Sequence, residues 1–337
     1  MDRSTERARL EVALDADGAR TQRRLRADTR GWALLGLALA SLAWATAFIF
    51  AKIALGGLSS PAIGVWRYAL AALALAPFAL RAGTPRGPAP GIEIGRSARR
   101  RAWVAVVAMS VFGGAIYQWL FLGALARTSA TATSLLIALN PVMTILLATI
   151  FGERLESRRA GGAALAFLGA VTVISKGDLA VLAGLHFGTG DLMALLAAAC
   201  WAIFNLCSRW AIGALAPSRV NVVVYGLGAL LLAAAAPGTP LLGELLRATP
   251  GVLLSVAALG LICSALAGQL FLFGVRALGV GQAATFIYLV PPLTALLAAL
   301  LLGERLGGGE LLGAGAVLAG VAVATRAERS ATPEPPG

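Results

Sequence analysis

Residues 141–155 read PVMTILLATIFGERL, and residues 292–306 read PLTALLAALLLGERL. In both stretches a proline precedes the glutamate of Gly-Glu-Arg-Leu by the same interval, which fixes an offset of 151 residues between the two copies. The same offset makes further identical pairs, among them Gln118 with Gln269, Gly162 with Gly313, and Gly169 with Gly320. Self-similarity at a fixed offset indicates that the chain is a duplicated unit.

The composition indicates what is duplicated. Hydrophobic residues make up 58% of the chain and charged residues 13%, and the mean hydropathy is +0.82, well above that of a soluble domain. In lipid every backbone group needs an internal partner, and strand alternation is absent from the sequence, so helices are expected. We predict an all-α polytopic membrane protein with ten transmembrane helices, five per repeat, near 32–55, 61–80, 103–125, 129–151, 160–175, 191–210, 218–236, 251–275, 281–302 and 309–325.

Lysine and arginine predict the orientation. If the N-terminus is cytoplasmic, 22 of the 28 Lys and Arg residues fall on the cytoplasmic side and four in the opposite loops. We therefore expect a multi-pass protein of the inner (plasma) membrane with both termini in the cytoplasm. Anionic lipid headgroups account for the net charge of +12, so it implies no nucleic-acid partner. The predicted domains are a disordered cytoplasmic tail at 1–30, repeats at 31–175 and 190–325, and a tail at 326–337.

An odd number of helices per repeat has a topological consequence. The second repeat must cross the bilayer in the opposite sense, so one Gly-Glu-Arg-Leu motif is expected on each side of the membrane. Repeats of inverted topology are typical of secondary transporters, because two related halves can rock about a site at their interface.

Several motifs resemble the EamA-type repeat of the drug/metabolite transporter superfamily over about residues 31–325. The residues that carry the resemblance are Trp44 eight before Lys52, Pro61 with Trp66-Arg67-Tyr68, the 130–141 helix, Trp201 eight before Arg209, and Pro217 before Tyr225. The resemblance implies a ten-helix carrier of amino acids, nucleobases, other metabolites or drugs. It also implies a central cavity lined chiefly by helices 1, 3, 4, 6, 8 and 9. Position 224, which corresponds to Arg67, is valine, so that cation is not duplicated.

Prolines predict where the helices are interrupted. Pro141, Pro291 and Pro292 cannot donate to the carbonyls four residues earlier, and matched interruptions in both halves favour a binding site or hinge at the bilayer midplane. The alternative is a packing kink. Asn140 and Tyr288 place polar groups at the same level and favour the site.

Polar and aromatic side chains within the helices are the other candidates for the substrate pathway. Gln118 and Gln269 are expected to face the bundle interior, either as cavity lining or as hydrogen-bonding contacts between helices. A metabolite-sized pocket is expected to take its walls from aromatic residues and one more amide: Trp44, Tyr117, Trp201 and Asn205.

Lys52 and Arg67 lie within helices 1 and 2. They are expected either to reach the headgroups or to attract an anionic group of the substrate, since the helix centres contain no Asp or Glu. The same absence, with His186 in a loop, disfavours a proton relay and favours facilitated flux or exchange.

The sequence implies no cofactor and no metal. Its three cysteines lack CxxC spacing, and no phosphate-binding loop occurs. We expect a carrier of small-molecule solutes, not an enzyme, surrounded by membrane lipids. The alternatives are a channel, a non-transporting scaffold and, less favoured, a polytopic membrane enzyme. The sequence is also compatible with a homodimer.

Overall fold

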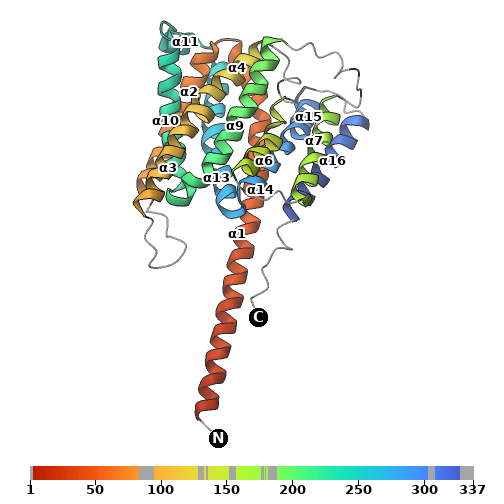
Figure 1. Ribbon diagram of the computed structural model, residues 1–337. Coiled ribbons are helices and arrows are strands. Elements are labelled where there is room, and N and C mark those ends of the chain that lie inside the picture. The colour runs from red at the N-terminus through yellow and green to blue at the C-terminus, as the bar shows by residue number, and fades with distance from the viewer. Residues whose placement is uncertain are drawn as a thin grey trace.

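The computed structural model describes residues 3–82, 95–127, 133, 136–151, 157–175, 178, 180, 188–302 and 308–326. Within these ranges every regular element is a helix, which confirms the all-α prediction there (Figure 1). The two Gly-Glu-Arg-Leu motifs and His186 lie outside the described residues. Six helices are long and apolar enough to cross a membrane: Thr29–Leu55, Ser60–Arg81, Arg96–Arg127, Thr189–Ala214, Pro217–Ala235 and Pro250–Leu278. The chain is therefore a multi-pass membrane protein.

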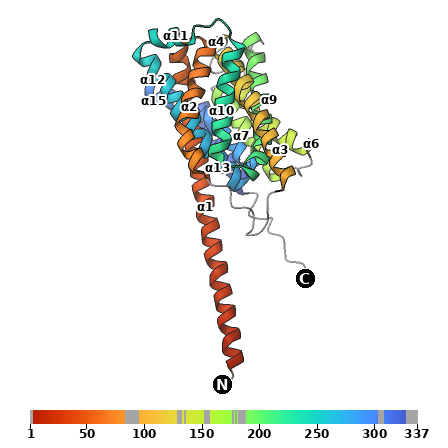
Figure 2. The same ribbon diagram turned by 90° about the vertical axis from the view of Figure 1, so that its left-hand side faces the viewer.

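Helix α1 (Arg3–Leu55) contains the first span and continues beyond it. Its N-terminal part projects away from the bundle as a single straight helix (Figures 1 and 2). The boundary at residue 30, predicted between a tail and the first span, thus falls inside one continuous helix. The apolar part of α1 packs against the second half of the chain.

The third and sixth of these spans share an irregularity that the sequence did not predict. α3 (Arg96–Ala108) and α4 (Tyr117–Arg127) are joined by the π-helical segment η1 (Met109–Ile116), and α12 (Pro250–Ala258) and α13 (Ala267–Leu278) by η2 (Leu259–Leu266). Each π segment has eight residues. π-helical turns are rare and are frequently found at functional sites. Their matched positions at mid-span place two widened turns at the centre of the bundle.

The halves of the chain interlock instead of forming separate bundles. The most extensive contacts join α7 (Ser157–Ile174) to α16 (Gly308–Arg326), α2 (Ser60–Arg81) to α10 (Pro217–Ala235), α1 to α13, and α4 to α9 (Thr189–Ala214). Each of these four contacts joins a helix of the first half to one of the second. Exchanging the halves converts the α1–α13 contact into the α9–α4 contact and leaves the other two unchanged.

Glycines allow α7 and α16 to cross at backbone distance. A Cβ atom on Gly169 would lie 2.7 Å from the carbonyl oxygen of Gly313, and one on Gly320 would lie 2.6 Å from that of Gly162. These are the glycines that the 151-residue offset pairs. Exchanging the halves therefore converts one contact into the other, and small residues bring the two helices together as they do in membrane bundles.

Two helices are interrupted near the prolines at which the sequence predicts a break. A turn at Ala138–Leu139 precedes α6 (Asn140–Ile150), which has Pro141 in its first turn. In the second half, α14 (Val280–Thr285) passes through the 3-10 segment η3 (Phe286–Leu289) into α15 (Val290–Leu302), which begins with Pro291 and Pro292 in its first turn. Proline is tolerated there because the first turn has no intrahelical partner for its N–H group.

A short helix, α11 (Leu241–Arg247), lies across the end of the bundle away from the N-terminus (Figure 1). The Glu244 carboxylate accepts a 2.7 Å hydrogen bond from the backbone N–H of Ser59, and the carbonyl of Leu241 accepts one of 3.0 Å from the indole of Trp66. These contacts fasten α11 to the start of α2 and hold the end of the helix that carries Arg67.

Candidate substrate cavity

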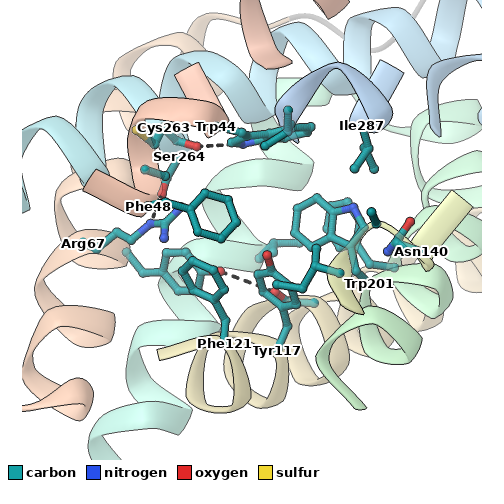
Figure 3. A pocket seen from close by; sticks show the side chains of 18 of the residues that line it. Trp44, Phe48, Arg67, Tyr117, Phe121, Asn140, Trp201, Cys263, Ser264 and Ile287 are labelled. Atoms are coloured by element: carbon teal, nitrogen blue, oxygen red, sulfur yellow. Dashed lines mark hydrogen bonds between the residues drawn. The ribbon is translucent and has the colours of Figure 1, made fainter. Parts of the chain in front are cut away.

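A cavity lies at the centre of the bundle, between helices of both halves (Figure 3). Its volume is about 70 Å³, enough for several water molecules or a small solute. The broken segments and both π-helical segments contribute to its wall. The residues that line it are Trp44, Ala47, Phe48, Arg67, Tyr68, Gly113, Tyr117, Phe121, Ile137, Ala138, Asn140, Trp201, Phe204, Val224, Tyr225, Cys263, Ser264, Ile287, Val290 and Pro291.

Eight of the twenty lining residues are aromatic, and Trp201 of α9 is at the centre of their packing. Its indole stacks on Phe204, with ring centroids 4.7 Å apart, and lies 4.8 Å from Tyr117. It also meets Trp44 edge-to-face at 5.7 Å. Stacked and edge-to-face arrangements are the favourable geometries for such pairs. The rings therefore hold one another and form a rigid apolar surface.

Among the described residues that line the cavity, Arg67 of α2 carries the only charge, and its side chain is 7% exposed. Its Nε donates a 2.6 Å hydrogen bond to the hydroxyl of Ser264, and Nη1 donates a 3.4 Å bond to Oε1 of Gln118. No carboxylate of the described residues pairs with the guanidinium. A buried cation that lacks a counter-ion is costly unless an anion reaches it.

Asn140 lies at the opposite end of the cavity from Arg67 (Figure 3). It is fully buried, and its Nδ2 donates to the carbonyl of Ala198 at 3.1 Å. Its Oδ1 accepts from Nδ2 of Asn205 at 3.1 Å and from the hydroxyl of Thr144 at 3.3 Å. This network ties the start of α6 to α9, so it holds the interrupted helix against the aromatic wall.

We expect Asn140→Ala to lower stability by about 1–3 kcal/mol, because the buried carbonyl of Ala198 and the amide of Asn205 each lose a partner. Asn205→Ala removes the other partner of the hydrogen bond between Asn205 and Asn140. A thermal-melting double-mutant cycle measures the coupling, and we expect the double variant to cost clearly less than the two single variants added together. Strict additivity would contradict a shared network.

The two predicted glutamines occupy related positions but do not line the cavity. Gln118 is fully buried behind Arg67 and accepts its Nη1 hydrogen bond. Gln269 accepts a 3.2 Å hydrogen bond from Nδ2 of Asn221, on α10. Each glutamine thus bonds to the second helix of its own half, α2 or α10. Of the two readings that the sequence left open, the geometry matches interhelical contact, and for Gln118 also support of the cavity cation.

The other predicted residues divide between the wall and its surroundings. Trp44, Arg67, Tyr117, Asn140, Trp201 and Pro291 line the cavity. Lys52 is exposed, and its ammonium donates to the carbonyl of Leu125 at 3.2 Å, near the end of α4 and outside the cavity. Tyr288 is buried beside Phe167, with ring centroids 6.4 Å apart, and Asn205, Pro141 and Pro292 likewise lie behind the wall.

Sequence reasoning proposed Arg67 of α2 but missed the two tyrosines that the second helices of the two halves contribute. Tyr68 of α2 and Tyr225 of α10 line the cavity with ring centroids 5.1 Å apart, and their hydroxyls donate to the carbonyls of Gly113 and Ser264 in the two π segments. Both tyrosines belong to the motifs of the family resemblance, yet only Arg67 was singled out there. The cavity therefore includes α2 and α10 beside the six helices that the resemblance implied.

The cysteines form no disulfide with one another, and Cys263 contributes to the cavity wall. Cys200, Cys207 and Cys263 are all free. Cys263 lines the cavity, and its Sγ donates to the carbonyl of Ala43 at 3.0 Å, while its own carbonyl accepts the indole N–H of Trp44. These contacts join η2 to α1 and orient Trp44.

Comparisons with known proteins agree with the architecture. A protein of Streptantibioticus cattleyicolor named "Probable terminal-alkyne amino-acid exporter" is 29% identical, over 90% of this chain and 97% of its own. An uncharacterized transporter of Bacillus subtilis is 25% identical, over 82% and 88%. A crystal structure of 22% sequence identity has a TM-score of 0.66, covers 89% of this chain and 99% of its own, and shares the fold.

A family model settles the relationship. The model described as the EamA-like transporter family matches twice, over residues 31–175 and 188–326, which together include every residue that lines the cavity. Both the family and the relatives are named as transporters, not as enzymes. The chain belongs to the EamA-like transporter family and is a membrane transporter of the drug/metabolite transporter type.

Proposed function

We propose that the protein is a secondary transporter that moves small metabolites across the cytoplasmic membrane by alternating access. The candidate solutes are amino acids, nucleobases and drug-like molecules. The observation that carries the proposal is the central cavity, which takes its wall from both family-model matches and contains a buried cation among aromatic rings. A site at the interface of two related halves is what a rocking mechanism requires.

The proposed architecture is ten transmembrane helices in two inverted repeats, 31–175 and 190–325, with both termini in the cytoplasm. The reciprocal contacts of α1 with α13 and of α9 with α4 support a two-fold relation between the halves. The glycine crossings of α7 and α16 support the same axis. The excess of Lys and Arg on one side supports the orientation and, with it, cytoplasmic ends at 1–30 and 326–337.

We further propose that the protein works as an exporter, driven by the gradient of its solute or by exchange. The named relative from Streptantibioticus cattleyicolor supports export. The lining residues among those described include no carboxylate or histidine, the groups that proton-coupled carriers commonly use as a relay.

Counterflow tests the transport function. Purified full-length protein in liposomes loaded with one unlabelled solute at a time, drawn from amino acids, nucleobases, organic anions and cationic drugs, should accumulate the same labelled solute transiently against its gradient. Initial rates should saturate with concentration. Flux that neither saturates nor shows counterflow would identify a channel, and the absence of flux for every class would favour a scaffold.

A further inference from the structure

We propose that the cavity binds small organic monoanions with an apolar body, such as carboxylates or sulfonates without an amino group, and that Arg67 binds their charged end. The proposal rests on the proposed transport function, since it names the class of solute that this same cavity carries. It distinguishes an anion from the zwitterions, cations and neutral molecules that the transporter class also includes.

The hydrogen-bond inventory of Arg67 points to an anion. A guanidinium has five N–H donors, and acceptors from the described part of the chain occupy two of them, Ser264 at 2.6 Å and Gln118 at 3.4 Å. The Ser264 hydroxyl in turn donates to the carbonyl of Leu259 at 2.9 Å, which leaves its oxygen free to accept from Nε. Arg67 is thereby held at the cavity wall with N–H groups left for a bidentate acceptor, the geometry that carboxylate and sulfonate oxygens fit.

Charge balance then selects the net charge of the solute. The cavity wall carries one positive charge and no negative one among its lining residues. A monoanion makes the loaded site neutral, whereas a zwitterion leaves it positive and a cation doubles the charge. Because electrostatic interactions are strong in a site shielded from water, this difference separates solutes of the same shape.

An ammonium group would have to share several acceptors with donors that are already present. The carbonyls of Gly113, Ser264 and Cys263 accept from Tyr68, Tyr225 and Trp44, and Oδ1 of Asn140 accepts from Asn205 and Thr144. The space between the ends is bordered by aromatic rings (Figure 3). It therefore suits an apolar body attached to the anionic head.

The test uses four probes with similar alkyl bodies: butanesulfonate as the monoanion, norvaline as the zwitterion, butylamine as the cation and pentanamide as the neutral molecule. Butanesulfonate remains charged near neutral pH, so it does not leak across lipid as a neutral acid. Titration of the tryptophan fluorescence of the purified protein measures binding, since Trp44 and Trp201 line the cavity. We expect butanesulfonate to bind at least about tenfold more tightly than each of the other three.

Variants of Arg67 test whether this residue causes the preference for the monoanion. Arg67→Gln should weaken butanesulfonate binding by about 30-fold or more and remove the preference, while Arg67→Lys should keep part of it. The matched control is Arg127→Gln, because Arg127 is exposed at the end of α4 and donates to the carbonyl of Gly123. Melting temperatures identify any variant that fails to fold. Ser264→Ala removes the Nε acceptor together with the hydroxyl that donates to Leu259, and it should weaken anion binding without reversing the preference.

The outcomes separate the two proposals. Equal binding of all four probes, binding of none, or an anion preference that survives Arg67→Gln would overturn the anion assignment even if counterflow of other solutes proceeds. Butanesulfonate binding that depends on Arg67, without counterflow of any solute, would support the assignment and overturn the transport function.

Discussion

The Gly320→Ala variant should lose about 3 kcal/mol of stability, although it adds only one methyl group. A Cβ atom at residue 320 would lie 2.4 Å from the backbone nitrogen of Ala166 and 2.6 Å from the carbonyl oxygen of Gly162. Both neighbours are backbone atoms of α7, so no side chain can move aside and the helices must separate. We expect the purified variant to have a markedly lower melting temperature, which size-exclusion chromatography after heating can measure.

Two glycines provide internal comparisons for this prediction. Gly315 lies on the same helix, α16, with no heavy atom within 4 Å of its Cβ position, so Gly315→Ala should leave the melting temperature unchanged or raise it slightly. Gly169→Ala meets the backbone of α16 at 2.6 Å and should reproduce the loss seen at Gly320. Equal melting temperatures for the variants at 320 and 315 would show that α7 and α16 do not cross as closely as described.

The glycine crossing also shows what the sequence could predict. The constant offset paired Gly162 with Gly313 and Gly169 with Gly320 before any contact was known, and the structure brings the same four residues together. Hydropathy also located the six long spans. The repeat offset and the hydropathy both succeed because they depend on the length and register of apolar helices. Trp44 and Trp201 were both expected in the wall of a pocket, and their rings meet in the cavity.

Side-chain depth and helix irregularity were harder to predict. Lys52 and Arg67 have similar sequence contexts, yet Lys52 reaches an exposed helix end whereas Arg67 points into the bundle, because rotation about the helix axis decides which face a residue occupies. Gly113 of the first π segment packs directly against Phe204, with no room for a Cβ atom, and no local sequence signal specifies this neighbour. The Gly-Glu-Arg-Leu motifs supplied the register but lie outside the described residues.

Trp201→Ala should reduce transport by at least about tenfold and lower stability by about 3–5 kcal/mol. Four aromatic side chains pack on this one indole: Trp44, Tyr117, Phe204 and Phe271, with centroid distances of 4.7 to 6.3 Å. Removing the indole enlarges the cavity, and the four neighbouring rings lose the side chain on which they pack. Counterflow rates in proteoliposomes, compared at equal amounts of folded protein, separate the transport loss from the stability loss.

Trp201 contributes to the wall through the packing of its ring, whereas the indole of Trp44 also donates a hydrogen bond to the carbonyl of Cys263 at 3.0 Å. Trp201→Phe should therefore retain most of the transport rate, whereas Trp44→Phe should lose more. Trp119→Ala is the matched control, since that indole is 44% exposed on α4 and does not line the cavity. Full transport by Trp201→Ala would mean that the aromatic wall does not hold the solute, and the cavity at the interface of the two halves would then need a different role.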